Sequence, residues 1–157
     1  MWEGLQHAGW VETLAVSRWL YGIVSVTHFS AVFFCVGTIV LVDLRILGVA
    51  DRHQSLSALA AQLRPWTWIA FGAVAVSGFL LFTSQAVGFA AATPFRFKML
   101  VVMLAVASTL VIETSLPKWD RAPVMPVTAR LLALVSILLW LGVILVSVEI
   151  PALTGLG

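Results

Sequence analysis

Charged side chains are scarce in this chain. Asp, Glu, Lys and Arg make up 10% of its 157 residues, 61% of the residues are hydrophobic, and the mean hydropathy is +1.06. Soluble domains carry about 25% charged residues because their surface must be wetted by water. The scarcity therefore excludes a soluble globular domain, and it predicts a single integral membrane domain over residues 1–157.

Several functional signatures are also missing. The single cysteine, Cys35, has no partner for an intrachain disulfide and is expected to pack as a small apolar residue. The nine basic residues are scattered and the net charge is only +2, so no basic stripe for nucleic acid is expected. The sequence contains no G-x-S-x-G, phosphate loop, H-E-x-x-H or C-x-x-C, so hydrolase, nucleotide, zinc and thiol-redox functions lack a starting residue.

Long hydrophobic runs are what the sequence does contain. A helix needs about 20 apolar residues to cross a bilayer, and four stretches meet this length, at about 19–42, 66–88, 95–115 and 128–150. Residues 1–17 have helical spacing of apolar residues with two tryptophans, which predicts a short interfacial helix. The expected fold is all-α: a four-transmembrane-helix bundle in the lipid bilayer with a short N-terminal interfacial helix.

Prolines and small residues refine this picture. Pro65 is expected at the start of the second span, and the three prolines of SLPKWDRAPVMP are expected to end the third helix. The segment between the first two spans is expected to be a wet, partly helical loop. Small side chains in the second span predict a face that packs closely against the first span. They are Gly72, Ala75, Ser77 and Gly78.

Basic residues differ between the two sides of the predicted bundle. The side of the two longer loops holds Arg45, Arg52, Arg64, Lys118, Arg121 and Arg130, and the other holds Arg18, Arg96 and Lys98. Basic residues resist translocation, so the first side is expected to be cytoplasmic. The sequence thus predicts a multi-pass membrane protein with both termini outside.

His28 is the one ionisable residue inside the first span. Such residues are costly in lipid and usually face the protein interior, where they serve a site. On a helix, His28 shares its face with Tyr21, Ser25, Cys35 and, approximately, Thr38. Two interpretations stay open: His28 is an axial ligand of haem iron, or it hydrogen-bonds to Ser or Thr on a neighbouring helix.

A second axial ligand has few candidates. His7 and His53 lie in interfacial or loop positions, which excludes a two-haem cytochrome with four histidines. The third span offers Lys98, Met99 and Met103. Met103 is about nine residues from the start of its predicted helix and His28 is about ten residues from the start of the first, so the two lie at similar depths in the membrane. Haem propionates need cations, and the end of the bundle where these two helices meet the membrane surface offers Arg18, Arg96 and Lys98. The methionines can equally fill gaps in an apolar core, and the cations can anchor helix ends.

Three segments carry a resemblance to known proteins. They are WLYGIVSVTHFSAVFFCVGTIVLVDLRILG, RPWTWIAFGAVAVSGFLLF and PFRFKMLVVMLA, and together they resemble a family of small bacterial four-span membrane proteins of unassigned function. This resemblance implies a bacterial inner membrane, with both termini in the periplasm. More distantly, they are similar to the haem-binding membrane protoporphyrinogen IX oxidase and the copper-resistance membrane domain. The oxidase resemblance implies that His28 and Lys98 form a functional pair. Glu113 and Thr114 stand where that family often has a histidine, so the resemblance implies the haem site more than the reaction.

Other ionisable residues are expected to play structural roles. Asp43 is expected to form an interfacial ion pair with Arg64 or Arg130. Two further carboxylates, Glu113 and Glu149, lie near opposite ends of the last two spans, and we expect them to form structural pairs rather than a proton path.

Two functions from different classes follow. The first is a haem b-binding membrane protein for electron transfer or oxidoreduction, with His28 as axial ligand and iron ligand and with Lys98, Met103, Arg96 and Tyr21 around the cofactor. The second is a non-catalytic small subunit of a larger membrane complex. Seven tryptophans and nine phenylalanines also predict a homo-oligomer or larger assembly.

Overall fold

The chain folds into helices joined by short turns. The computed structural model describes residues 2–49 and 54–154. These residues form α1 (Trp2–Gln6), α2 (Gly9–Val16), α3 (Arg18–Leu47), α4 (Leu56–Ser84), α5 (Ala86–Ala91), α6 (Thr93–Asp120) and α7 (Val127–Thr154). No strand occurs in the described ranges, which confirms the all-α prediction.

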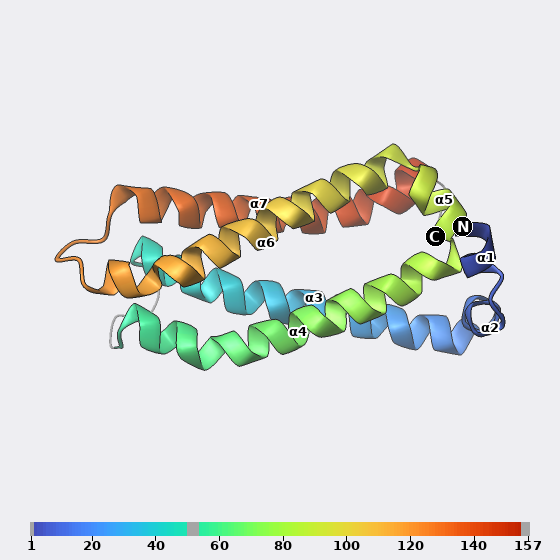
Figure 1. Cartoon of the computed structure of the whole chain (residues 1–157), viewed down its shortest axis with the longest axis horizontal. Coiled ribbons are helices and arrows are strands. Elements are labelled where there is room, and N and C mark those ends of the chain that lie inside the picture. The colour runs from blue at the N-terminus through green and yellow to red at the C-terminus, as the bar shows by residue number, and fades with distance from the viewer. Residues whose placement is uncertain (1, 50–53, 155–157) are drawn as a thin grey trace.

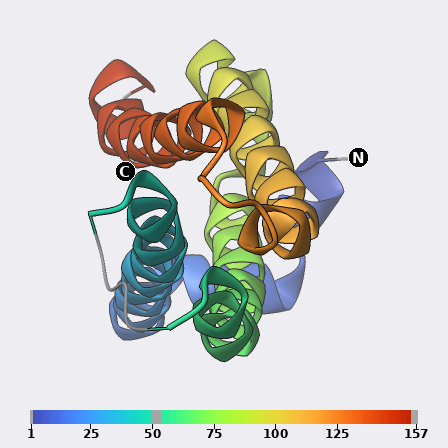
Figure 2. The same ribbon diagram turned by 90° about the vertical axis from the view of Figure 1, so that its left-hand side faces the viewer.

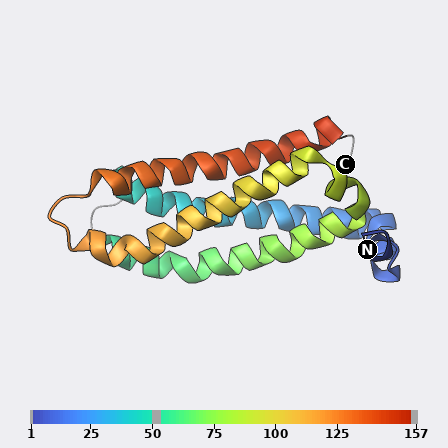
Figure 3. The same cartoon turned by 45° about the horizontal axis from the view of Figure 1, so that its top comes forward.

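The four long helices form an up-and-down bundle (Figure 1). Viewed from one end, they stand in the ring order α3, α4, α6, α7, so α3 and α6 occupy opposite corners (Figure 2). Helix α3 packs against α4 and α7, and α6 packs against α7 and α4. The α3–α4 and α6–α7 turns lie at one end of the bundle, and α1, α2 and α5 lie at the other (Figures 1 and 3).

These four helices are long and apolar enough to cross a membrane. At 1.5 Å per residue, the 30 residues of α3 extend about 45 Å, which exceeds the roughly 30 Å of a hydrocarbon core. Most of their surface faces outward and is rich in large apolar side chains such as Phe33, Ile69 and Leu138. This is the surface of a protein solvated by lipid. The chain is a multi-pass membrane protein.

All four long helices extend beyond the predicted spans at one end or both, and in two of them a proline does not end the helix. Helix α4 begins at Leu56 and contains Pro65, and α6 continues through Pro117 to Asp120. The expectation that prolines mark these helix boundaries was therefore wrong. The added turns bury Leu56 and Trp119 in a hydrophobic core at the end of the bundle that carries the α6–α7 turn, which is called the loop end below. This burial compensates for the hydrogen bond that each proline removes.

The loop end is closed by caps and a compact core. Both carboxylate oxygens of Asp120, at the end of α6, accept hydrogen bonds from the first backbone N–H groups of α4, at 3.1 Å from Leu56 and 2.8 Å from Ser57. The Ser55 hydroxyl accepts a third, from Ala58. Three donors at the start of α4 are thus satisfied, and one cap joins two helices that are distant in sequence.

The opposite end is covered by the short helices. The Gln6 side chain of α1 accepts a hydrogen bond from the Val87 backbone of α5 at 3.1 Å, and Trp2 meets the ring of Phe82 edge-on. Phe82, Phe89 and Phe95 stack on one another and join α4, α5 and α6. The predicted N-terminal helix is therefore two short helices packed across the end of the bundle.

Candidate functional site

His28 lies in the N-terminal half of α3 and points at α4. Its Nδ1 atom is 3.0 Å from the Ser77 hydroxyl oxygen. Ser77 also donates its only hydroxyl hydrogen to the backbone of its own helix, at Ala73. The hydroxyl can therefore only accept from the histidine, so Nδ1 carries the ring hydrogen and Nε2 keeps its lone pair. A Val74 carbonyl close to the ring is a second acceptor.

Gly78 brings the backbone of α4 against the histidine ring. A Cβ atom placed on Gly78 would lie 3.0 Å from His28 Cε1, which is closer than ordinary carbon contacts. The predicted small-residue face is thus confirmed at Ser77 and Gly78. Gly72 and Ala75 are exposed instead, and a Cβ atom on Gly72 would meet nothing within 4 Å.

The third-span candidates differ in their relation to His28. The ammonium group of Lys98 is half-buried and lies within Coulombic range of the imidazole. Met103 is 66% exposed, and Met99 is exposed as well. His28 and Met103 each lie ten residues from the first residue of their helix, which is about 15 Å of helix, but α3 and α6 stand at opposite corners. Depth alone therefore does not bring the methionine to the histidine.

The remaining predicted site residues lie near the same end. Tyr21 is half-buried on α3, two turns before His28. Arg96 is exposed, and its guanidinium donates to the Ala90 carbonyl at 3.2 Å from Nε and 3.1 Å from an Nη atom, which closes the α5–α6 turn.

A groove of about 760 Å³ runs beside the start of α3. Its described lining is Arg18, Trp19, Gly22, Ile23, Val26 and Thr27.

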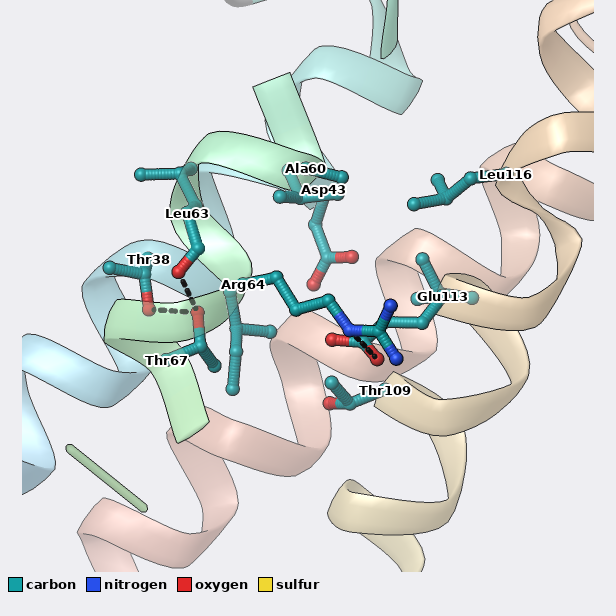
Figure 4. A pocket seen from close by; sticks show the side chains of 12 residues that line it. Thr38, Asp43, Ala60, Leu63, Arg64, Thr67, Thr109, Glu113 and Leu116 are labelled. Carbon is teal, nitrogen blue, oxygen red and sulfur yellow. Dashed lines mark hydrogen bonds and ion pairs between the residues drawn. The ribbon is translucent and has the colours of Figure 1, made fainter. Parts of the chain in front are cut away.

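A second polar cluster lies toward the loop end of the bundle (Figure 4). Arg64 of α4 and Glu113 of α6 form an ion pair with a 3.5 Å separation, and Trp68 donates its indole N–H to Glu113 at 3.1 Å. Glu113 is thus in a structural pair, as the sequence predicted. The expected ion pair of Asp43 was wrong: Arg64 pairs with Glu113, Arg130 is exposed, and neither carboxylate oxygen of Asp43 has a partner among the described residues. The side chain of Glu149 and the whole of Arg52 and His53 lie outside the described residues.

These side chains border a cavity of about 30 Å³. Its hydroxyl groups are mutually satisfied: Thr67 donates to Thr38 at 2.9 Å, Thr38 donates to the Cys35 carbonyl at 2.8 Å, and Thr109 accepts from Trp140 at 3.1 Å. Cys35 is buried as predicted and directs its Sγ atom at the Thr67 carbonyl, 3.7 Å away. Within residues 2–49 and 54–154, no group of three His, Cys, Asp or Glu side chains is arranged to hold a metal ion.

Asp43 is the exception in this cavity. Its side chain is 1% exposed, and neither carboxylate oxygen has a hydrogen-bond partner among the described residues. Ser136 of α7 approaches the carboxyl and is itself fully buried with an unpartnered hydroxyl. Sequence reasoning placed Asp43 in a wet loop and did not single out Ser136. The available signal was a serine within the otherwise apolar run LLALVSILLWLGV.

Comparisons with known proteins add no relative. The chain matches no family model, and no curated protein or solved structure matches it.

Proposed function

We propose that this chain binds one haem b in the membrane, with His28 as an axial ligand, and takes part in electron transfer or oxidoreduction there. The observation that carries the proposal is the hydrogen bond from His28 Nδ1 to Ser77. Histidines that bind iron usually donate their other ring N–H to a fixed acceptor, which sets the tautomer and the ring orientation. Ser77 is such an acceptor, and Nε2 is left as the nitrogen that can bind iron.

The residues around His28 fit this cofactor. Neutral imidazole suits iron, and the surrounding spans supply an apolar environment. Lys98 lies in electrostatic range of the imidazole, whereas Met103 is 66% exposed, so we infer that Lys98, rather than Met103, acts on the cofactor as a sixth ligand or as a partner of a propionate. Arg96 and Arg18 lie at the same end and supply further cations. Bound haem would supply a one-electron redox centre, and the protein would hold it and set its potential.

Replacing His28 tests the proposal directly. The full chain is expressed with ample haem and purified in detergent, and its absorption spectrum is recorded. We expect a Soret band in the wild type, its loss in His28→Ala, and its retention in the control His7→Ala, which removes a histidine outside the long helices. A wild type without Soret absorbance would end the haem proposal. If His28 only bridges two helices, His28→Ala costs about 0.6 kcal/mol and changes no spectrum.

Replacing Lys98 separates its two proposed roles. Lys98→Met keeps much of the side-chain volume and removes the cation. In the haem-binding protein we expect weaker retention of the cofactor or a shifted redox potential, with the Soret band still present. Because a methionine thioether can itself bind haem iron, the two roles are separated in Lys98→Leu, which offers no ligand atom. A change from low-spin to high-spin iron in Lys98→Leu would identify Lys98 as the sixth ligand, and an unchanged spin state would identify it as a propionate partner.

The second candidate is a non-catalytic subunit that packs in a larger membrane complex or with copies of itself. It is favoured by large aromatic side chains on the outer surface, such as Trp19, Phe29 and Phe33, which can contact lipid or another chain. A colourless protein that co-purifies with other subunits would support this function. Mass measurement in mild detergent would detect a homo-oligomer, and a monomer alone would contradict one.

A further inference from the structure

We propose that Asp43 is a buried proton-binding site, which exchanges its proton with the aqueous phase through water in the adjoining cavity and through Glu113. The site lies toward the loop end of the bundle, 15 residues along α3 from His28, or about 22 Å of helix. The proposal does not rest on haem binding.

Asp43 differs from the other polar side chains of the cavity in its hydrogen bonds. The threonines that line it have partners, whereas both oxygens of Asp43 have none among the described residues. An ionised carboxylate has four acceptor positions, and the single Ser136 hydroxyl is the donor that approaches it, so the charge would still be strongly unfavourable at 1% exposure. A neutral carboxylic acid avoids that charge and brings its own O–H donor, which the unpartnered Ser136 hydroxyl oxygen can accept.

The charged side chains that line the cavity also favour a protonated Asp43. Its charged lining residues are Asp43 on α3, Arg64 on α4 and Glu113 on α6, and α7 presents the neutral Ser136 to Asp43. Arg45, two residues further along α3, donates from one Nη atom to the Gln54 carbonyl at 2.9 Å, and its buried Nε has no partner among the described residues. With all three ionised, the set carries one negative charge, so one proton makes it neutral. The arginine already neutralises Glu113, and the added proton therefore belongs on Asp43.

The cavity gives Asp43 a path to water. The cavity volume of about 30 Å³ exceeds the roughly 10–15 Å³ that a cavity needs to hold one water molecule. Figure 4 shows the Asp43 carboxyl directed into the space beside Arg64 and Glu113. Exposure rises along this series, from 1% for Asp43 to 17% for the Glu113 side chain and 68% for that of Arg64. The Asp43 O–H bond breaks as its proton passes to the water molecule, which in turn gives a proton to a Glu113 carboxylate oxygen. The reverse steps restore Asp43.

Infrared spectroscopy of the detergent-purified full chain tests the site, because a protonated carboxyl has a carbonyl stretch separate from those of carboxylates and amides. At neutral pH we expect this band in the wild type and in the control Asp120→Asn, and its loss in Asp43→Asn. Ser136→Ala should shift the band without removing it. If Asp43→Asn does not fold, Asp43→Glu must move the band. A wild type without the band, or a band unaffected by both changes at position 43, would overturn the proposal.

Deuterium exchange and a change of salt test the path and the ligand. The wild-type band should shift in D₂O, and the shift should be slower in Glu113→Gln and unchanged in rate in Asp120→Asn. A band that never shifts, or a rate that Glu113→Gln leaves unchanged, would refute the path. Loss of the band when potassium is replaced by sodium would show that the site takes a sodium ion in place of the proton, which would also overturn the proposal.

Discussion

The contact between Gly78 and His28 yields a prediction that isolates one feature of the site. In Gly78→Ala, the new Cβ atom would lie 3.0 Å from His28 Cε1, whereas carbon atoms pack at about 3.5–4.0 Å. The ring must therefore move by about 0.5 Å or more, away from α4. Ser77 lies on α4 too, so this movement lengthens the 3.0 Å hydrogen bond toward the limit at which it is lost.

The magnitude comes from two opposing terms. Overpacking of this kind costs about 1–3 kcal/mol, whereas alanine is favoured over glycine within a helix by about 1 kcal/mol. We expect Gly78→Ala to lower the free energy of unfolding by about 0–2 kcal/mol. Gly72→Ala is the matched control, because it lies on the same helix and its new Cβ atom would meet nothing within 4 Å. The helix-propensity gain cancels between the two variants, so their difference should be about 1–3 kcal/mol.

Reversible unfolding in mixed detergent micelles measures this difference. In the haem-binding protein, Gly78→Ala should also retain less cofactor than Gly72→Ala. Equal unfolding free energies for the two variants would refute the close packing of α4 against His28.

Three further predictions concern the loop end and the orientation. Glu113→Gln should cost no more than about 1 kcal/mol, because the Arg64 side chain is exposed and Gln still accepts from Trp68, whereas Glu113→Ala should cost more and alter tryptophan fluorescence. Asp120→Ala should destabilise the protein by about 1 kcal/mol, measured by the same unfolding assay, since the first N–H groups of α4 lose their acceptors. A reporter fused after Gly157 should report a periplasmic C-terminus, and a cytoplasmic signal would reverse the orientation that the basic residues predict.

Part of the candidate site could be predicted from the sequence. A histidine in the middle of an apolar run is costly in lipid, and this cost alone directs His28 to the bundle interior. The small residues that follow 49 and 50 positions later indicate where a neighbouring helix can come close, and Ser77 and Gly78 do contact the ring. The binding of haem stays a prediction. The sequence did not indicate that Lys98 lies within Coulombic range of the imidazole or that Met103 is 66% exposed, because depth along a helix carries no information about which helices are neighbours.

Length and hydropathy by themselves determined the membrane environment and the four-helix architecture, because each span must satisfy its own backbone in lipid. The ring order of the helices, the continuation of α4 and α6 through Pro65 and Pro117, and the pairing of Arg64 with Glu113 were decided by tertiary packing. The burial of Asp43 was decided in the same way. A carboxylate near the end of an apolar run is compatible with a wet loop or with a closed core, and only the packing of α4, α6 and α7 around α3 removes it from water.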